Sequence, residues 1–128
     1  MPPRQAVHEL SICQALIAQV ERIATSHGAQ SVELVKLRVG PLAGVEPLLL
    51  QHAYPFASAG TVAAGSTLVI EPVPLKVSCA TCGAETEAEP NRLICGACGD
   101  YHTRLVSGDE MTLMSVGLIM SERGTDDV

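Results

Sequence analysis

Two C-x-x-C pairs constrain this chain more than any other feature of its sequence. Cys79 and Cys82 form the first pair, Cys95 and Cys98 form the second, and twelve residues separate the two pairs. Two residues between the thiolates let both sulfurs of a pair reach one ion from a single tight turn. A glycine follows each pair and can adopt the left-handed conformation that such a turn often needs. Four sulfurs from two such turns are the tetrahedral ligand set of structural zinc, so the spacing predicts a zinc ribbon.

We expect the segment from Lys76 to Arg104 to need this metal for its folding. It has few large apolar side chains, mainly Val77, Leu93 and Ile94, so burial alone does not stabilise it. Zinc binding contributes on the order of 10–16 kcal/mol to peptides of this kind, and a closed four-cysteine shell leaves no position for a substrate. The alternatives are a rubredoxin-like iron site and a redox pair of dithiols. The single aromatic side chain of the segment, Tyr101, disfavours the iron site, because rubredoxins pack several aromatic rings around their iron.

The charge of the chain argues against nucleic acid as a partner. The 128 residues have a formal net charge of −6, and an acidic chain repels phosphate backbones. Four thiolates around one zinc ion add further negative charge. A zinc-ribbon adaptor that binds a transcription or nucleic-acid complex is therefore kept only as an alternative function of this chain. The charged residues of the cysteine segment are Lys76, Arg92 and Arg104 against Glu85, Glu87, Glu89 and Asp100, and the three glutamates are expected on a solvated hairpin edge.

The sequence indicates a cytoplasmic protein. No stretch approaches about 18 consecutive apolar residues, so no membrane span is expected. The first six residues lack the apolar core of a secretory signal. Five cysteines, four of them paired by spacing, are typical of metal binding in a reducing compartment.

Hydrophobic periodicity predicts two helices and three strands outside the cysteine segment. Apolar residues recur at three- and four-residue steps in the first helix, and apolar and polar residues alternate in the first strand. Pro55 lacks an N–H and is expected to kink the second helix or end it early. Leu48, Leu49, Leu50, Ala53 and Phe56 are expected on its apolar side. The predicted elements are a helix over 8–27, a strand over 31–40, a helix from 46–47, a strand over 66–73 and a strand from 111.

The order of these elements predicts a small α+β fold with an inserted module. The second and third strands flank the cysteine segment. We therefore expect a three-stranded sheet with two helices, formed by residues 1–74 together with 106–120, and a zinc-ribbon insert at 75–105. The polar residues 121–128 are expected to form a flexible tail.

His8 and Glu9 stand side by side at the predicted start of the first helix. The simplest interpretation is that Glu9 complements the helix dipole and that His8 is exposed. A metal site is the alternative interpretation of this pair. Cys13 lies on the apolar face of the same helix and is interpreted as a small core residue.

The remaining polar residues do not suggest catalysis. The sequence has no Ser/His/Asp or Cys/His arrangement, phosphate loop or suggestive carboxylate pair, so the chain is not expected to be an enzyme. Glu46 and Glu71 are candidates for partner contacts, and His52 is a candidate for approach to a metal. A solvated or half-buried side chain is the simpler interpretation of each, and His102 is likewise expected to be exposed.

Four runs of sequence resemble a known family. In order they are "HELSICQALI", "LRVGPLAGVEP", "GSTLVIEPVP" and "SGDEM", with the two C-x-x-C pairs between the last two. In these motifs and their spacing the chain is similar to the HypA/HybF family of hydrogenase nickel-incorporation proteins, from about Val7 to Leu118. The family fold is a nickel-binding α+β domain with a zinc-ribbon insert, which agrees with the order of elements above.

The resemblance implies a nickel metallochaperone that binds Ni(II) at the start of the first helix and delivers it for [NiFe]-hydrogenase maturation. His8 corresponds to the nickel imidazole. Glu9 is its neighbour, which supplies a backbone nitrogen and a carboxylate that tunes the site. The four paired cysteines correspond to the zinc ligands. The implied partners are a HypB-type maturation GTPase and the hydrogenase large subunit, with urease maturation proteins as an alternative destination and with no nucleic acid or membrane.

The chain departs from the family pattern at its start. The family begins Met-His-Glu, and its terminal amine is expected in the nickel shell. Here Val7 takes the place of that methionine, and six residues precede it. One hypothesis is that position 7 is a GUG start codon, which is read as Met when it initiates translation. The intact mass of protein made from its own gene tests this hypothesis, and a product that keeps Pro2 and Pro3 contradicts it.

Overall fold

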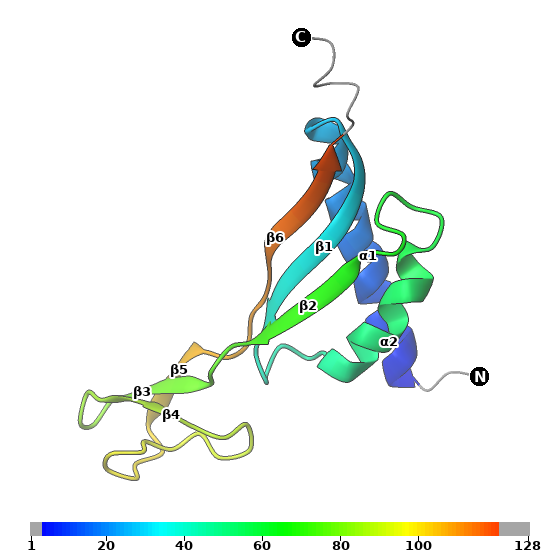
Figure 1. Cartoon of the computed structure of the whole chain (residues 1–128). Coiled ribbons are helices and arrows are strands. Elements are labelled where there is room, and N and C mark those ends of the chain that lie inside the picture. The colour runs from blue at the N-terminus through cyan, green and yellow to red at the C-terminus, as the bar shows by residue number, and fades with distance from the viewer. Residues whose placement is uncertain (1–3, 121–128) are drawn as a thin grey trace. The chain divides into compact units, whose positions relative to one another are not determined.

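The structure, a computed structural model, describes the backbone of residues 4–120 and the side chains from residue 8 onward (Figure 1). The tail predicted at 121–128 lies outside the described residues. Over the described part of the chain, neither helix has the length and apolar character needed to cross a membrane. The elements are α1 (Arg4–Ser26), β1 (Ala29–Val39), α2 (Pro47–Ser58), β2 (Thr67–Pro72), β3 (Lys76–Cys79), β4 (Glu85–Glu87), β5 (Thr103–Ser107) and β6 (Met111–Met120).

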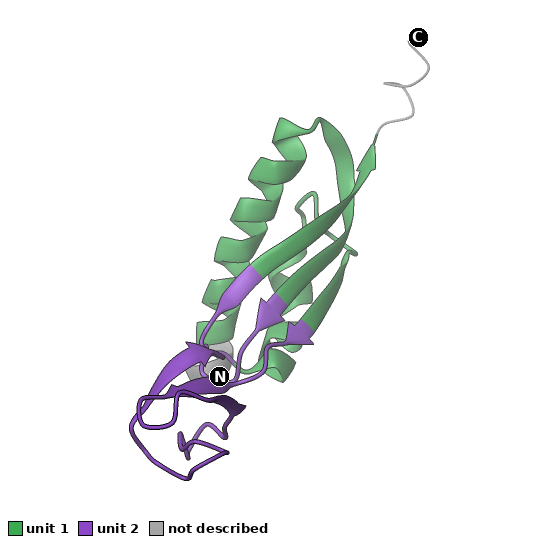
Figure 2. Cartoon of the chain, turned by 90° about the vertical axis from the view of Figure 1, so that its left-hand side faces the viewer, with its two compact units in different colours: residues 1–37, 46–70, 113–128 green, residues 38–45, 71–112 purple. Residues whose placement is uncertain are grey.

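The chain forms two compact units, which Figure 2 colours separately. Unit 1 comprises residues 1–37, 46–70 and 113–128, and unit 2 comprises residues 38–45 and 71–112. The chain passes from one unit to the other within β1, within β2 and within β6. The domain boundaries expected from the sequence, at 75 and 105, remain a prediction.

The first sheet has the strand order β2-β1-β6. The N–H of Val32 donates to the carbonyl of Val62, and the N–H of Val73 donates to the carbonyl of Val39. This order of partners makes β2 parallel to β1, with α2 as the connection between them. β6 runs antiparallel to β1, since Gly40 donates to Glu110 while Gly117 lies against Leu34 further along. The three-stranded sheet with two helices is therefore confirmed.

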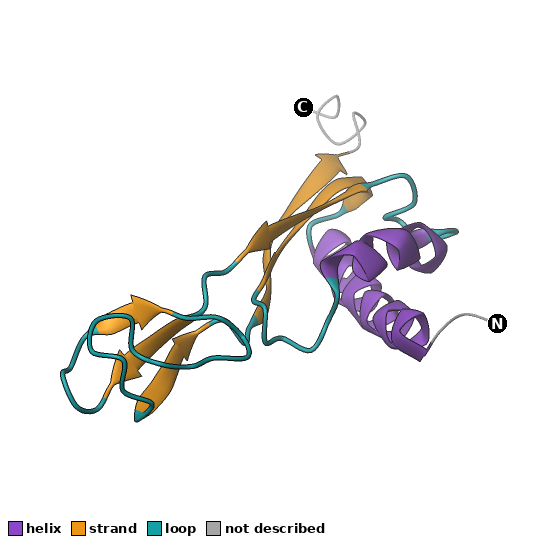
Figure 3. Cartoon of the chain, turned by 90° about the horizontal axis from the view of Figure 1, so that it is seen from below, coloured by secondary structure: helices purple, strands orange, loops and turns teal. Residues whose placement is uncertain are grey.

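Both helices lie on the same face of this sheet (Figure 3). The alternation in β1 explains why, because Val35, Leu37 and Val39 are buried while Lys36 is half-buried and Arg38 is exposed. α1 meets the sheet with an aliphatic stripe at helical spacing. The buried residues of α1 include Cys13, Leu16, Ile17, Val20 and Ala24, and the prediction that Cys13 belongs to the core is confirmed.

The start of α1 was predicted wrongly. The helix begins at Arg4, four residues before the expected start at His8. Pro3 precedes Arg4, and proline is tolerated at the entrance of a helix because the first N–H groups have no intrahelical acceptors there. Arginine, glutamine and alanine then favour a helix. His8 consequently belongs to the second turn of α1.

The second helix differs from expectation at two places. It continues past Pro55 to Ser58, so of the two outcomes expected at Pro55, a kink or an early end, the early end is wrong. Pro55 and Gln51 are both exposed, and the carbonyl of Gln51 that Pro55 leaves without a donor can be hydrated. Leu48 and Phe56 are not on the buried side: they are 61% and 78% exposed.

Unit 2 contains a small antiparallel sheet with the order β4-β3-β5. Glu85 and Glu87 are exposed on the outer strand β4, which confirms that these glutamates line a solvated edge. Elsewhere in unit 2, Gly40 and Gly108 lie so close together that the N–H of Leu42 donates to the Gly108 carbonyl at 2.7 Å. The small sheet β4-β3-β5 carries the first of the paired cysteines, Cys79, at the end of β3.

Candidate metal centre

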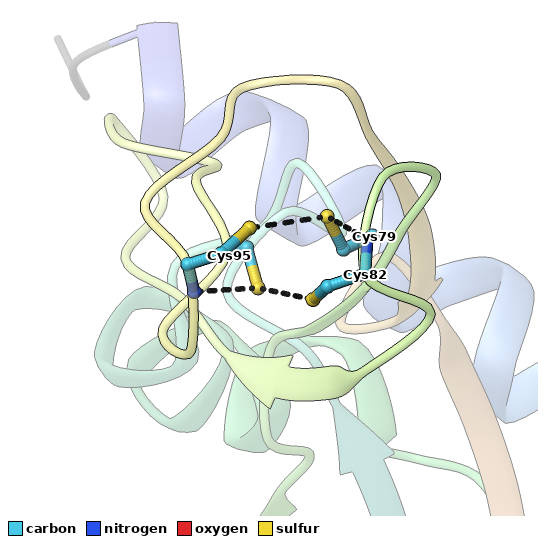
Figure 4. Close-up of side chains that lie close together, drawn as sticks. Cys79, Cys82 and Cys95 are labelled. Atoms are coloured by element: carbon cyan, nitrogen blue, oxygen red, sulfur yellow. Dashed lines mark hydrogen bonds between the residues drawn. The ribbon is translucent and has the colours of Figure 1, made fainter.

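Two turns bring the four paired cysteines together, three of which Figure 4 labels. Cys79 ends β3 and Cys82 follows in a turn, while Cys95 and Cys98 occupy a second turn before β5. The sulfurs of Cys79 and Cys98 are 3.6 Å apart, as are those of Cys82 and Cys95. All four sulfurs lie within 4.8 Å of one another. Four sulfurs held about 2.3 Å from one ion in a tetrahedron are about 3.8 Å apart, so the cluster fits a structural zinc ion.

The two turns have the same hydrogen bonds. Gly83 donates to the carbonyl of Cys79 at 3.0 Å, and Gly99 donates to that of Cys95 at 2.8 Å. Both glycines have a positive φ, of 77° and 80°, which explains why a glycine closes each turn. Two backbone N–H groups also point at the first sulfur of each turn. These donors are Thr81 and Cys82 toward Cys79, and Ala97 and Cys98 toward Cys95.

The pKa values of the clustered thiols favour the binding of a cation among them. The backbone N–H groups of Cys98 and Ala97 lower the pKa of the Cys95 thiol to about 6, because they stabilise its thiolate. The N–H of Asp100 acts in the same direction on Cys98, but the sulfur of Cys79, burial and the sulfurs of Cys82 and Cys95 together outweigh it and raise the pKa of Cys98 to about 12. Sulfurs this close do not all ionise unaided. A divalent ion among them removes the conflict, because its charge stabilises all four thiolates.

Asp100 braces the second turn from outside the cluster. Its backbone carbonyl accepts from the N–H of Cys95 at 2.9 Å. Its carboxylate accepts from the hydroxyl of Thr81 and contacts the Nδ1 atom of His102 at 2.9 Å. The Thr81 hydroxyl and then His102 lower the pKa of Asp100 to about 2. Asp100 therefore links the two cysteine turns.

His102 lies outside the sulfur cluster. Its side chain is 60% exposed and stacks on the ring of Tyr101 at a centroid distance of 4.2 Å. The expectation of an exposed His102 is confirmed. Within the described residues, the four cysteines are the one group of three or more side chains placed to bind a metal.

His8 and Glu9 point in different directions from α1. His8 is exposed, whereas Glu9 is only 2% exposed, because neighbouring residues of a helix do not face the same way. The Oε2 atom of Glu9 accepts a 2.9 Å hydrogen bond from the backbone N–H of Glu46. Its Oε1 atom is buried and has no hydrogen-bond partner. The carboxylate of Glu9 thus faces the region where α2 begins.

The early start of α1 also determines which backbone nitrogens are accessible. A helix leaves the N–H groups of its first four residues without intrahelical acceptors. Because α1 begins at Arg4, these groups belong to residues 4–7. The N–H groups of His8 and Glu9 point at the carbonyls of the preceding turn.

Sequence reasoning did not anticipate the contact between Glu9 and Glu46. Glu46 is the N-cap of α2, where its Oε1 atom accepts from the N–H of Leu48 at 3.4 Å. The available signal was the helical spacing of Glu9 and Cys13, four residues apart on the buried face of α1.

The structure also places the other polar residues that the sequence singled out. Glu71 was a candidate for partner contacts, and its Oε2 atom lies 3.8 Å from a guanidinium nitrogen of Arg38. His52 is exposed on α2.

The fold and the sulfur cluster define a small α+β protein with a four-cysteine metal ribbon. The family model described as "Hydrogenase/urease nickel incorporation, metallochaperone, hypA" matches residues 7–118. The chain belongs to this family of nickel metallochaperones, and the resemblance inferred from its motifs is confirmed.

Individual relatives cover almost the same range. The "Hydrogenase maturation factor HypA" of Nitrosospira multiformis is 64% identical over 113 residues, which are 88% of this chain and 98% of the relative. The protein of the same name from Aquifex aeolicus is 40% identical over 112 residues, 88% and 97% of the two chains. The solution structure of the Ni metallochaperone HypA from Helicobacter pylori has the same fold, with a TM-score of 0.62, 23% identity and coverage of 88% and 98%.

Proposed function

We propose that this chain is a nickel carrier without enzymatic activity, which binds Ni(II) at His8 and delivers it for the maturation of [NiFe]-hydrogenase. Its membership of the nickel-incorporation family is the observation that supports this function most strongly. The relatives above, which are named as hydrogenase maturation factors, favour hydrogenase over urease as the destination.

The exposed imidazole of His8 is the nickel ligand in this proposal. A carrier must take its ion from solution and give it up again, which an exposed side chain near the end of a helix permits and a closed cage does not. Imidazole suits Ni(II), and the neutral ring is the form that binds. The buried carboxylate of Glu9 faces away from His8. We therefore assign Glu9 a contribution through its backbone nitrogen and through the orientation of the site.

Coordination by a backbone nitrogen requires a change at the start of α1. The amides of His8 and Glu9 lie in the helix that begins at Arg4, where their hydrogens point at carbonyls. Either the first turn opens when nickel binds, or the functional chain starts at position 7 and offers these nitrogens directly. In the second case the terminal amine next to His8 is a further ligand.

Zinc has a different role from nickel in this proposal. One Zn²⁺ ion would be held by Cys79, Cys82, Cys95 and Cys98. It would neutralise the charge of the thiolates and hold the two turns together. The side chains of this closed site leave no coordination position for cargo. The ribbon then serves as a shaped surface for the proposed partners, a HypB-type GTPase and the hydrogenase large subunit.

A nickel titration by calorimetry on zinc-loaded protein tests the role of His8. We expect one Ni(II) per chain, and a loss of affinity of at least about tenfold in His8→Ala. His52→Ala is the matched control, because His52 is also an exposed histidine of a helix in unit 1. The titration is repeated on a chain that starts with Met in place of Val7.

Each result has a definite meaning. Equal losses in the two histidine variants would remove His8 as the specific ligand. Absence of nickel binding by both wild-type forms would overturn the carrier function and favour the zinc-ribbon adaptor. Tighter binding by the shorter chain would show that the terminal amine contributes to the shell.

A further inference from the structure

The small sheet of unit 2 carries a hollow on its solvent-facing side, where β3 and β5 lie side by side (Figure 1). The volume of the hollow is about 440 Å³, and its lining consists of Ser78, Ala80, His102, Thr103 and Arg104. The strand period explains this lining, because side chains two residues apart point to the same face of a strand. Val77 and Cys79, on either side of Ser78, are buried on the other face.

The hollow results from a difference in side-chain size. Ser78 pairs with Arg104 across the two strands, and the N–H of Ala80 donates to the carbonyl of His102 at 2.8 Å. Two small side chains from the β3 side therefore stand beside two long side chains from the β5 side. The small pair forms a floor, and the long pair forms one wall.

The hydrogen-bond donors around this hollow are available to a ligand. Among the described residues, the Arg104 guanidinium has no carboxylate within ion-pair distance, and the Ser78 hydroxyl has no hydrogen-bond partner. His102 uses its Nδ1 atom for the carboxylate of Asp100, at 2.9 Å, so its Nε2 atom remains for a second partner. A guanidinium beside a hydroxyl is a donor set that suits an anion.

We propose that this hollow binds the carboxylate of an aspartate or glutamate side chain in a segment of a partner protein. The planar guanidinium of Arg104 matches the two oxygens of a carboxylate, and the hydroxyl of Ser78 can donate to one of them. The hollow belongs to unit 2, whereas His8 belongs to unit 1. The proposed site therefore does not depend on nickel binding.

The surroundings of the hollow favour a protein over a free small acid. Tyr101 stacks on His102 and is 74% exposed, and Val106, two residues after Arg104, is 47% exposed. Tyrosine and arginine are enriched among the side chains that anchor protein interfaces. Sites for small molecules instead enclose most of the ligand, whereas Ala80, His102 and Arg104 are exposed to solvent.

Charge restricts the partner further. The chain has a net charge of −6, so it repels a strongly acidic protein. Glu85 of β4 pairs with Ser78 on the side opposite to Arg104, which puts a negative charge two strand spacings, about 10 Å, from the Arg104 position. The carboxylate of Asp100 is already engaged in hydrogen bonds. The segment that fits has one carboxylate among neutral residues, and the higher charge of a phosphate group is disfavoured.

A nuclear magnetic resonance titration of the zinc-loaded full chain tests the proposal. The probe is the capped peptide Gly-Ser-Leu-Glu-Leu-Ser-Gly, and the same peptide with glutamine in place of glutamate is its control. The glutamate peptide should shift the amide signals of residues 78–80 and 102–104 and should bind at least about tenfold more tightly than the glutamine peptide. Arg104→Gln should lose the same factor. Arg92→Gln is the matched control, because Arg92 is another exposed arginine of unit 2, and it should change the affinity by less than about twofold.

Glu85→Gln gives a result of the opposite sign. Removal of a negative charge about 10 Å from Arg104 should tighten binding of the glutamate peptide about twofold. Damage to the fold would not produce tighter binding, so this variant separates a charge effect from a structural one. The amide spectrum of each variant without peptide reports whether it is folded.

Several outcomes would overturn the proposal. Equal affinities for the glutamate and glutamine peptides would do so, as would equal losses in the two arginine variants or the absence of any shift with the glutamate peptide. Acetate that binds as tightly as the peptide would show that the hollow takes a free acid. Inorganic phosphate that binds more tightly than the peptide would show that the hollow is not a carboxylate site. These titrations use no nickel, so this proposal and the nickel function of His8 can fail separately.

Discussion

At the scale of single residues, Glu9 is the most informative side chain of unit 1. A carboxylate that is 2% exposed needs donors, and one of its oxygens accepts from Glu46 while the other has no partner. The accepted bond joins the second turn of α1 to the first residues of α2. The bond to Glu46 therefore fixes the orientation of the α1 turn that carries both Glu9 and His8.

Replacement of Glu9 by alanine should destabilise the protein by about 1–3 kcal/mol, because the N–H of Glu46 loses its acceptor and a small void forms. Glu9→Gln keeps a carbonyl oxygen at this position and should cost less. Urea unfolding of zinc-loaded protein, followed by the helical signal, measures both. Glu33→Ala, at an exposed position of β1, is the control and should change stability by less than about 0.5 kcal/mol. Equal stabilities of Glu9→Ala and Glu33→Ala would mean that the bond to Glu46 is not important for the fold.

Glu9 and Phe56 also mark the limit of what the sequence predicts. The period of α1 placed Cys13 correctly, because apolar spacing reports which face is buried. The same reasoning does not place a carboxylate in the interior, since that depends on a donor from Glu46, 37 positions away. Phe56 was expected inside as an apolar residue, yet it is 78% exposed. Which face of α2 is buried depends on its packing against α1 and the sheet rather than on its composition.

At the scale of elements, the cysteine turns were predictable from the sequence, whereas the close approach of Gly40, just after β1, to Gly108, shortly before β6, was not. A C-x-x-C-G turn is local, so its geometry follows from spacing and from one glycine. The approach of Gly40 to Gly108 brings together positions that no local pattern connects. A Cβ atom on Gly40 would lie within 3 Å of the backbone of Gly108, including its carbonyl carbon and Cα. Only glycine at position 40 allows β1 to end where the chain enters β6.

Gly40→Ala should therefore destabilise unit 2 by about 3 kcal/mol, because backbone on both sides of the contact must move. Gly44→Ala is the control in the same loop. Its φ of 80° makes alanine unfavourable, but a Cβ there meets nothing within 4 Å, so a cost of about 1 kcal/mol is expected. Thermal unfolding of the two zinc-loaded variants compares them. A Gly44→Ala variant as unstable as Gly40→Ala would show that the backbone conformation of this loop, rather than the contact between Gly40 and Gly108, is the dominant constraint on its residues.

At the scale of the whole molecule, the two units should respond differently to loss of zinc. Unit 1 has an aliphatic core supplied by both helices and the sheet, which requires no metal. In unit 2 the sulfur cluster joins two turns and its sheet strands are short: β3, β4 and β5 have four, three and five residues. Sheets of this size need a further source of stability, which metal binding supplies.

Chelation of zinc under native conditions should consequently expose four cysteines and leave the fifth protected. Iodoacetamide followed by mass spectrometry should find labels on Cys79, Cys82, Cys95 and Cys98, with the helical signal retained. Cys13 is fully buried and donates to the Leu50 carbonyl at 3.6 Å. Burial, followed by the nearby Glu9, raises the pKa of its thiol to about 11, so both its accessibility and its thiolate fraction are low.

Two controls bracket this labelling experiment. The zinc-loaded protein should label slowly at all five cysteines, and the urea-unfolded protein should label quickly at all five. Fast labelling of Cys13 after native chelation would mean that unit 1 opens together with the ribbon. In that case zinc would stabilise the entire chain, because its loss would be transmitted through the three strands that both units share. Protection of Cys13 alone would instead mean that the core of α1 and α2 stays folded while the ribbon gains and loses its metal.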